Sequence, residues 1–381
     1  MTQELREIFT RDFILGFLSL FAFTFVFTIL IPTLPIYLSR LGSNEVEIGV
    51  LIGSFAVSSL ALRPFIGKAL QRIPEKHFMM AGALLFALAS LGYLFTPPFW
   101  PFLIVRVLQG IGFGFFQTAS FTLVANISSG ARRGQSLSYF TLAMSLSSAL
   151  GPAIGMFIIN HFNFTLLFLA CSGLSLCSLF ISNKLGRRPV APLQHSSVKD
   201  GAFLSRKAIP PSILSFCPLF IWGALGAFFP LYAINQGVAN PGYFFTTVAI
   251  MVILGRALGG RFLDLYHRDK VILPCLFSYI LSMTILAFSK NLPMFLLVAV
   301  VWGIGNAFLI PVLAVYALDR AGSASTAMGT LTAFSDLGVC LGPVIMGVVL
   351  HSSSYPVMFL CLAFTGVLNL VYFYYFVRKK E

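Results

Sequence analysis

Long segments that are nearly free of charged residues recur along the whole chain, and they restrict what it can fold into. A helix needs about 20 apolar residues to cross the hydrocarbon core of a bilayer. We expect twelve such segments, near residues 13–38, 47–66, 78–96, 100–125, 136–160, 164–183, 209–233, 243–260, 271–288, 293–317, 326–350 and 355–376. Continuous apolar runs such as Phe13–Leu30 exclude the alternating pattern of a transmembrane β-barrel.

Glycine and proline signatures occur twice, about half a chain apart. Gly110-Ile111-Gly112 returns as Gly303-Ile304-Gly305 after 193 residues, and Gly151-Pro152 returns as Gly342-Pro343 after 191 residues. A duplicated set of membrane helices is typical of transporters whose two halves rock around a site between them. We therefore expect an all-α membrane protein with twelve transmembrane helices in two pseudo-symmetric six-helix bundles, 1–183 and 209–381. A basic, proline-bearing cytoplasmic linker, 184–208, joins them.

Charge supports this interpretation. Only 10% of the 381 residues are charged and 58% are hydrophobic, whereas soluble domains carry about 25% charged residues. If the N-terminus is inside, twenty Lys and Arg residues fall on the cytoplasmic side and only Arg40 and Lys290 outside. This asymmetry predicts that both termini are cytoplasmic. The net charge of +13 is spread over short loops, so it does not indicate nucleic-acid binding.

Several function classes are disfavoured. The chain carries no Gly-rich nucleotide-binding loop, which argues against an ATP-driven pump. No Ser/His/Asp or metal-ligand cluster emerges, and the six cysteines lie in predicted helices without metal-ligand spacing. We expect no enzyme activity, no cofactor and no metal, in a monomer that contacts membrane lipid.

The chain resembles the major facilitator superfamily, and within it the proton-antiporting drug-efflux branch. The segment Arg106 to Gly114 closely matches the Arg-x-x-Gln-Gly-x-Gly motif of that family. Gly151-Pro152-Ala153-Ile154-Gly155 matches the core of its antiporter motif, although Ser138, Ser147 and Met156 stand where the motif has glycines. The repeat in the second half keeps the spacing better, as Gly329, Gly338, Gly342 and Pro343.

The loop after the second segment is a degraded form of another family motif. Gly67, Arg72 and Lys76 match the motif, whereas Gln71 stands where the motif has an acidic residue and Pro74 where it has a glycine. The equivalent loop of the second half keeps Gly260 and Asp264, with Arg268 and Lys270 following. The resemblance implies conformational roles for these loops and for the packing glycines and prolines. The predicted set is Gly67, Arg72, Gly151, Pro152, Gly155, Gly260, Asp264, Arg268, Gly338, Gly342 and Pro343.

Two charged residues inside the segments are candidates for proton coupling. A charged group in a spanning helix is costly and usually faces a cavity or a partner. Arg106 is followed by Gln109 and Gly110, which form a polar, small-residue stripe, although snorkelling to the outer surface is an alternative. Asp336 is the only acidic residue well inside a segment, and it is equally compatible with a hydrogen-bonded carboxyl at a helix interface.

Candidates for substrate binding come from the helices that line the cavity in this family, the first, fourth, seventh and tenth. They are aromatic or uncharged and polar, which suits amphipathic ligands. The set is Phe23, Thr28, Tyr37, Gln109, Gln117, Trp222, Tyr232, Trp302, Asn306 and Tyr316.

These features together predict a secondary active transporter of the bacterial inner (plasma) membrane. It would export a small amphipathic molecule, a drug-like compound or a metabolite, in exchange for protons by alternating access. Two alternatives stay open. One is an exporter or importer of a polar metabolite, such as a metal chelator (siderophore) or an amino acid. The other is a non-transporting membrane sensor on the same scaffold.

Overall fold

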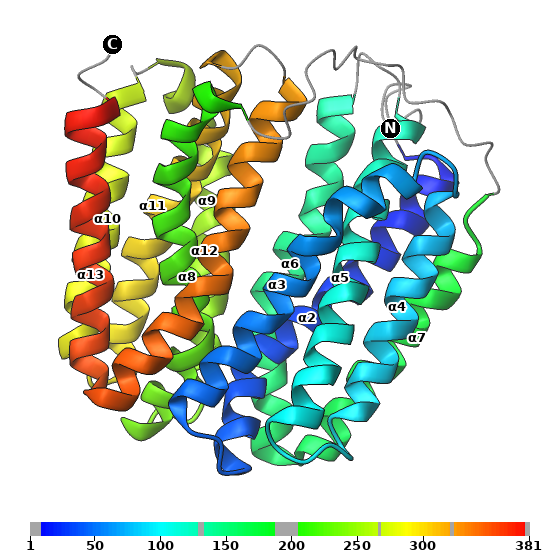
Figure 1. Ribbon diagram of the computed structural model, residues 1–381, viewed down its shortest axis with the longest axis horizontal. Coiled ribbons are helices and arrows are strands. Elements are labelled where there is room, and N and C mark those ends of the chain that lie inside the picture. The colour runs from blue at the N-terminus through cyan, green and yellow to red at the C-terminus, as the bar shows by residue number, and fades with distance from the viewer. Residues whose placement is uncertain (1–8, 129–132, 187–204, 266–267, 321–323, 378–381) are drawn as a thin grey trace. The chain divides into compact units, whose positions relative to one another are not determined.

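The computed structural model describes residues 9–128, 133–186, 205–265, 268–320 and 324–377, and these are almost entirely helical (Figure 1). The helices of the first half are α2 (Arg11–Arg40), α3 (Glu45–Ala69), α4 (Glu75–Gly92), α5 (Trp100–Ile127), α6 (Arg133–His161) and α7 (Phe164–Asn183). Those of the second half are α8 (Ile209–Asn235), α9 (Gly242–Leu265), α10 (Arg268–Phe288), α11 (Leu292–Arg320), α12 (Ala324–Ser352) and α13 (Tyr355–Tyr372). A 3₁₀ turn, Arg206–Ala208, precedes α8, and a π-helical turn, Phe373–Val377, follows α13.

Each segment predicted to cross the membrane coincides with one of these helices, although 78–96 runs past the end of α4 at Gly92 and 355–376 runs past α13 into the π-helical turn. The all-α prediction is confirmed for the described residues. Helices satisfy their own backbone hydrogen bonds, which a bilayer requires. Ten of the described helices are long and apolar enough to span a membrane. The described residues of α4 and α9 do not reach that standard, and those of α9 form a shorter apolar segment, Gly242–Ala257. Twelve crossings and the two-bundle arrangement therefore stay predictions.

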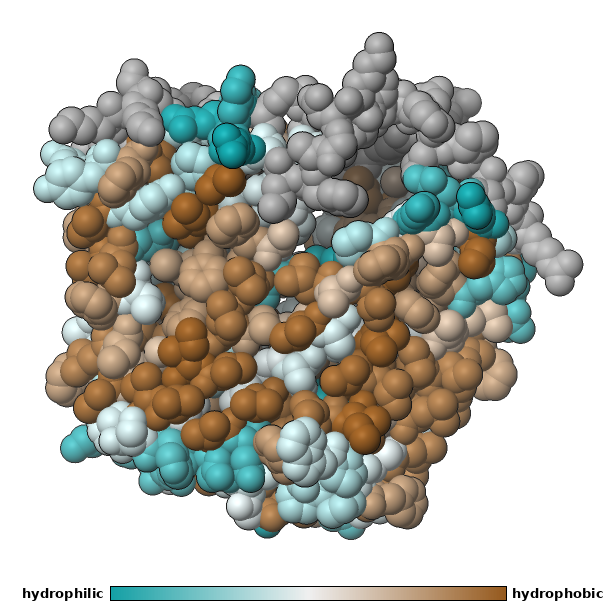
Figure 2. Space-filling view, viewed as in Figure 1, coloured by the Kyte–Doolittle hydropathy of each residue, from teal (hydrophilic) through white to brown (hydrophobic). Residues whose placement is uncertain are grey.

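The surface has the character of a lipid-facing one. Along α13 the exposed side chains Val357, Leu360, Phe364 and Leu368 recur at helical spacing and form an apolar stripe. Figure 2 shows apolar side chains over the middle of the helices and hydrophilic ones toward their ends. In water such a surface would be unfavourable, so it indicates contact with lipid.

The chain divides into two compact units. Unit 1 consists of Met1–Thr33 and Ser54–Val198, and unit 2 of Leu34–Gly53 and Lys199–Glu381. The end of α2 and the first part of α3 thus belong to unit 2. The domain boundaries expected from the sequence, 1–183 and 209–381, stay predictions.

In unit 1, hydroxyl groups fasten α2 to its neighbours. The Thr28 hydroxyl donates to the Ser147 carbonyl of α6 at 2.9 Å, and the Ser147 hydroxyl donates to the Phe21 carbonyl of α2 at 3.1 Å. Ser147 stands where the antiporter motif that this segment resembles has glycine. A glycine at this position would let the helices approach closely. The serine side chain instead joins them through hydrogen bonds.

In unit 2, glycines let α8 and α12 approach closely. A Cβ atom added to Gly338 would lie 2.9 Å from the Phe220 nitrogen, and one added to Gly342 would lie 3.0 Å from the Phe220 carbonyl carbon. Because these neighbours are backbone atoms, they cannot move aside as a side chain could. Small residues at such positions let membrane helices pack without a hydrophobic driving force.

Candidate functional site

The most distinctive site in unit 1 is a buried polar cluster around Arg106 of α5. Its Nη1 donates a hydrogen bond to Gln109 Oε1 at 2.7 Å. The same oxygen accepts a hydrogen bond of 2.5 Å from the hydroxyl of Tyr93, which caps the C-terminus of α4. Arg106 is 6% exposed, Gln109 1% and Tyr93 0%. The polar stripe expected at Arg106 and Gln109 is therefore real, and its side chains are buried rather than extended to the outer surface.

An aromatic ring lies beside the guanidinium. The Cζ atom of Arg106 is 4.8 Å from the ring centroid of Phe55 on α3. A guanidinium over an aromatic face is attracted by the quadrupole of the ring, by about 2 kcal/mol or more when the pair is desolvated. Phe55 also contacts Phe27 and Phe113, with centroids 5.5 and 5.2 Å away. The charge is thus held by an amide oxygen and an aromatic face, and the Tyr93 phenol donates to the same amide oxygen.

The other candidates of unit 1 are buried or half-buried. Phe23 is fully buried and stacks on Phe116 with ring centroids 3.9 Å apart. Thr28 is buried and hydrogen-bonded within its own helix and to α6. Gln117 is half-buried, and its amide nitrogen approaches Met144 Sδ at 3.5 Å. Gln117 Oε1 has no hydrogen-bond partner among the described residues.

In unit 2, two candidates come together on α11. Trp302 is 1% exposed, and its ring lies 4.3 Å from that of Tyr279 on α10. The Tyr279 hydroxyl donates to Asn306 Oδ1 at 3.5 Å. The indole Nε1 of Trp302 is buried and has no acceptor among the described residues. A buried donor without an acceptor costs about 1–3 kcal/mol, which marks this nitrogen as a position where a ligand could bind.

The remaining candidates lie apart from Trp302 and Asn306. Tyr232 is buried among the rings of Phe295, Tyr355 and Phe359, and its hydroxyl donates to the Ser289 carbonyl at 2.5 Å. Tyr316 lies beneath the Arg320 guanidinium, 4.5 Å from Cζ to the ring centroid.

Two further candidates are half-buried. Trp222 makes an edge contact with Phe245, with ring centroids 5.7 Å apart. Tyr37 lies on the part of α2 that belongs to unit 2. Of these four candidates, Tyr232 has the contacts of a packing residue, because its ring is surrounded by three others.

Asp336 lies on α12 and is half-buried. The hydroxyl of the preceding residue, Ser335, donates a hydrogen bond to Ser215 Oγ of α8 at 3.0 Å. Asp336 thus lies next to the contact between α8 and α12. Arg106 belongs to unit 1 and Asp336 to unit 2.

The residues expected to control conformation fall into three groups. Gly151, Gly155, Gly338 and Gly342 are buried where helices cross inside their own unit, and a Cβ on Gly155 would lie 2.9 Å from the Ile29 carbonyl oxygen. The neighbouring Pro152 and Pro343 are buried too, inside α6 and α12. By contrast, Arg72 is exposed and Gly67 has open space around it. The side chains at Gly260, Asp264 and Arg268 lie outside the described residues.

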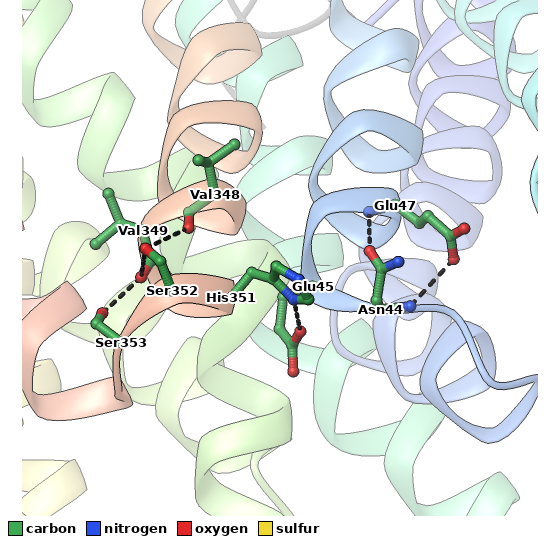
Figure 3. Close-up of polar contacts among 8 residues, drawn as sticks. All are labelled: Asn44, Glu45, Glu47, Val348, Val349, His351, Ser352 and Ser353. Atoms are coloured by element: carbon green, nitrogen blue, oxygen red, sulfur yellow. Dashed lines mark hydrogen bonds and ion pairs between the residues drawn. The ribbon is translucent and has the colours of Figure 1, made fainter.

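A further polar contact in unit 2 joins the start of α3 to the end of α12 (Figure 3). His351 Nδ1 lies 3.0 Å from Glu45 Oε2, and both side chains are more than a third exposed. Asn44 and Glu47 form a reciprocal capping box at the start of α3, with bonds of 3.1 and 2.9 Å. The same two helices also approach closely at Gly53 of α3, where an added Cβ would lie 2.7 Å from the Cys340 carbonyl oxygen of α12.

Sequence reasoning missed Tyr93, Phe55 and Tyr279. Each comes from a helix outside the set expected to line a cavity. The available signal for Tyr93 was a single hydroxyl at the end of an apolar segment, which is weak by itself.

Comparison with known proteins places this arrangement in a family. The model of the Major Facilitator Superfamily matches residues 16–264 and 239–381. The chain is 23% identical over 355 residues to the staphylopine export protein of Staphylococcus aureus (strain Mu50 / ATCC 700699), covering 87% of this chain and 88% of that protein. It is 24% identical over 336 residues to the quinolone resistance protein NorA of Staphylococcus aureus (strain COL), covering 84% of each.

Solved structures show the same fold. The nucleoside transporter NupG superposes with a TM-score of 0.79 at 14% identity, over 97% of this chain and 100% of that chain. The human organic anion transporter MFSD10 (TETRAN) gives a TM-score of 0.70 at 18% identity, over 98% of this chain and 100% of that chain. The family match extends over nearly the whole chain, and the relatives are membrane transporters rather than enzymes. The protein is therefore an integral membrane transporter that belongs to the Major Facilitator Superfamily.

Proposed function

We propose that this protein exports a small amphipathic molecule across the bacterial plasma membrane in exchange for protons, by alternating access. The observation that carries the proposal is the buried Arg106, held inside a membrane-spanning helix by Gln109 and Phe55. A charge retained at such a position costs energy and is typical of ion and substrate pathways. Export as the direction of transport is supported by two relatives, one named an export protein and the other a resistance protein.

The two coupling residues have different chemistry. An arginine guanidinium stays protonated in proteins, so Arg106 would act through its fixed charge. A carboxylate can bind and release a proton within the pH range that a cell imposes when its surroundings are apolar. Asp336, half-buried on α12, is therefore the proposed proton carrier.

The proposed ligand is a neutral or cationic amphipath. Aromatic rings and uncharged polar groups dominate the candidate positions, with Trp302 and Asn306 in unit 2 and Gln109 and Gln117 in unit 1. Pockets lined by groups of this kind bind apolar bodies and orient them through a few hydrogen bonds. The proposal includes cytoplasmic termini and a monomeric transporter.

A second candidate is export of a polar metabolite. The similarity to a staphylopine export protein favours it, and Arg106 could bind one carboxylate of such a ligand.

The test uses purified protein in liposomes that contain an interior pH dye. Ethidium, norfloxacin, a metal chelator and an amino acid are each added under an imposed proton gradient. We expect ligand-dependent proton movement with ethidium or norfloxacin, and its loss in Asp336→Asn. Asp319→Asn is the matched control, because Asp319 lies exposed near the end of α11.

Each result has a definite meaning. Proton movement driven only by the chelator or the amino acid would favour the second candidate. Ligand flux without proton movement would contradict proton coupling and return Asp336 to a packing role. Binding without any flux would favour a sensor.

A further inference from the structure

Tyr93 hydrogen-bonds to one of the two polar residues of α5 although it belongs to another helix. Its hydroxyl donates to Gln109 Oε1 at 2.5 Å, and the same oxygen accepts a hydrogen bond of 2.7 Å from Arg106 Nη1. An amide oxygen has two lone pairs, so Gln109 Oε1 accepts from Tyr93 and from Arg106 at the same time. We call these three side chains, linked through the one oxygen, the polar triangle.

The position of this hydroxyl is determined by rings from two other helices. The Tyr93 ring stacks on Phe102 of α5, with centroids 4.7 Å apart, and packs against Phe168 of α7 at 5.4 Å. Both phenylalanines are fully buried. Tightly packed aromatic rings hold their rotamers, so the hydroxyl has little freedom to move.

The orientation of the Gln109 amide matters because its two ends have nearly the same shape and opposite polarity. A rotation of half a turn would bring its NH₂ group toward the donors of Arg106. Two sets of donors would then face each other in a buried setting where neither is solvated. A hydrogen bond from Tyr93 to the oxygen favours the productive orientation.

The internal repeat supplies an independent comparison. At an offset of 193 residues, Tyr93 corresponds to Leu286, Arg106 to Ala299 and Gln109 to Trp302. All three equivalents are buried in unit 2. Phe102, in contrast, corresponds to Phe295, which is buried as well. The repeat thus packs at these positions without the polar triangle, so the triangle is not needed for helix packing as such.

We propose that Tyr93 is a positioning residue for Arg106: its hydroxyl holds the Gln109 oxygen toward the guanidinium and thereby orients the charge. The inference rests on the proposed function, which gives Arg106 its part in transport. It concerns a hydrogen bond that a phenylalanine at position 93 could not make, in a site where the ring itself would still pack.

The first arm of the test reads the guanidinium directly and needs no ligand. Protein labelled with nitrogen-15 arginine gives an Arg106 side-chain signal, assigned by its loss in Arg106→Lys. We expect Tyr93→Phe to shift or broaden this signal, while Tyr139→Phe leaves it unchanged. Tyr139 lies on α6 and contacts Phe9, away from the triangle. Thermal midpoints verify that both variants remain folded.

A rescue variant separates orientation from packing. Gln109→Glu places an acceptor oxygen at both ends of the side chain, so its rotation no longer matters. In that background Tyr93→Phe is expected to leave the Arg106 signal unchanged. An unchanged signal in Tyr93→Phe alone, or an equal change with and without Gln109→Glu, would overturn the inference.

The second arm measures proton-driven ethidium efflux. Loss of a hydrogen bond within a charged network is expected to lower kcat about tenfold in Tyr93→Phe, with KM changed less than about twofold. If kcat is unchanged although the wild type couples ethidium to protons, Tyr93 does not position Arg106 for transport. If the wild type moves no ethidium, the proposed function fails for this cation, and the Arg106 signal still decides the role of Tyr93.

Discussion

Ser19 of α2 and Ser178 of α7 are joined by two reciprocal hydrogen bonds, in which each hydroxyl donates to the carbonyl of the other residue. The distances are 3.0 Å from Ser19 Oγ to the Ser178 carbonyl and 2.9 Å in the opposite direction. Ser182 Oγ lies a further 2.7 Å from Ser19 Oγ, and all three serines are fully buried. In a bilayer, where apolar side chains gain little from leaving lipid, such bonds are a principal source of helix association.

We expect Ser178→Ala to destabilise unit 1 by about 0.6 kcal/mol, the average for hydrogen bonds between membrane helices, and by no more than about 1.7 kcal/mol. The thermal midpoint in detergent checks this. The control is Ser145→Ala, because among the described residues the Ser145 hydroxyl donates only to the Thr141 carbonyl of its own helix. A double-mutant cycle with Ser19→Ala should be non-additive, and strictly additive losses would contradict a direct interaction.

The contact between α8 and α12 leads to a second prediction. An added Cβ at Gly342 would meet backbone atoms of Phe220 and Ala224, so Gly342→Ala should force the helices apart and cost about 1–3 kcal/mol. Gly173→Ala is the matched control, since nothing lies within 4 Å of its added Cβ. Expression level and thermal midpoint report the difference. Equal stability of the two variants would mean that the contact at Gly342 is looser than described.

The junction of α3 and α12 allows two interactions to be ranked. The side chains of Glu45 and His351 are more than a third exposed, so Glu45→Gln is expected to cost less than about 1 kcal/mol, and less still at high salt. Gly53→Ala should cost about 1–3 kcal/mol because its Cβ would lie 2.7 Å from a backbone oxygen. Thermal midpoints at low and high salt test the ranking. A larger loss in Glu45→Gln would reverse it.

Substitution of Trp302 should affect ligand affinity more than stability. Trp302→Phe removes a buried N–H that has no acceptor among the described residues, so part of the packing loss is offset by about 1–3 kcal/mol. We therefore expect a small change in thermal midpoint together with about a tenfold weaker affinity for norfloxacin if the indole donates to the ligand. Trp100→Phe is the control, at an exposed position that begins α5. Unchanged affinity would remove Trp302 from the binding set.

Much of the fold was predictable because it depends on local properties of the chain. The segments expected near 100–125 and 164–183 correspond to α5, Trp100–Ile127, and α7, Phe164–Asn183. Hydropathy predicts them because each helix must be apolar over its own length to lie in lipid. The spacing of Arg106 and Gln109 also predicted that they lie on one polar stripe of the helix, since residues three apart on a helix are neighbours.

The partners of these residues required the tertiary structure. Tyr93 reaches Gln109 from another helix because Phe102 and Phe168 hold its ring in place, and Phe55 reaches Arg106 from a third helix. Likewise, a glycine face is visible in the sequence, but the neighbour that it admits, Phe220 for Gly342, is not. Hydropathy and motif spacing are properties of one segment and are readable along the chain. Which side chains share a buried site depends on how helices cross and which rings fill the space between them, and many distant residues decide that together.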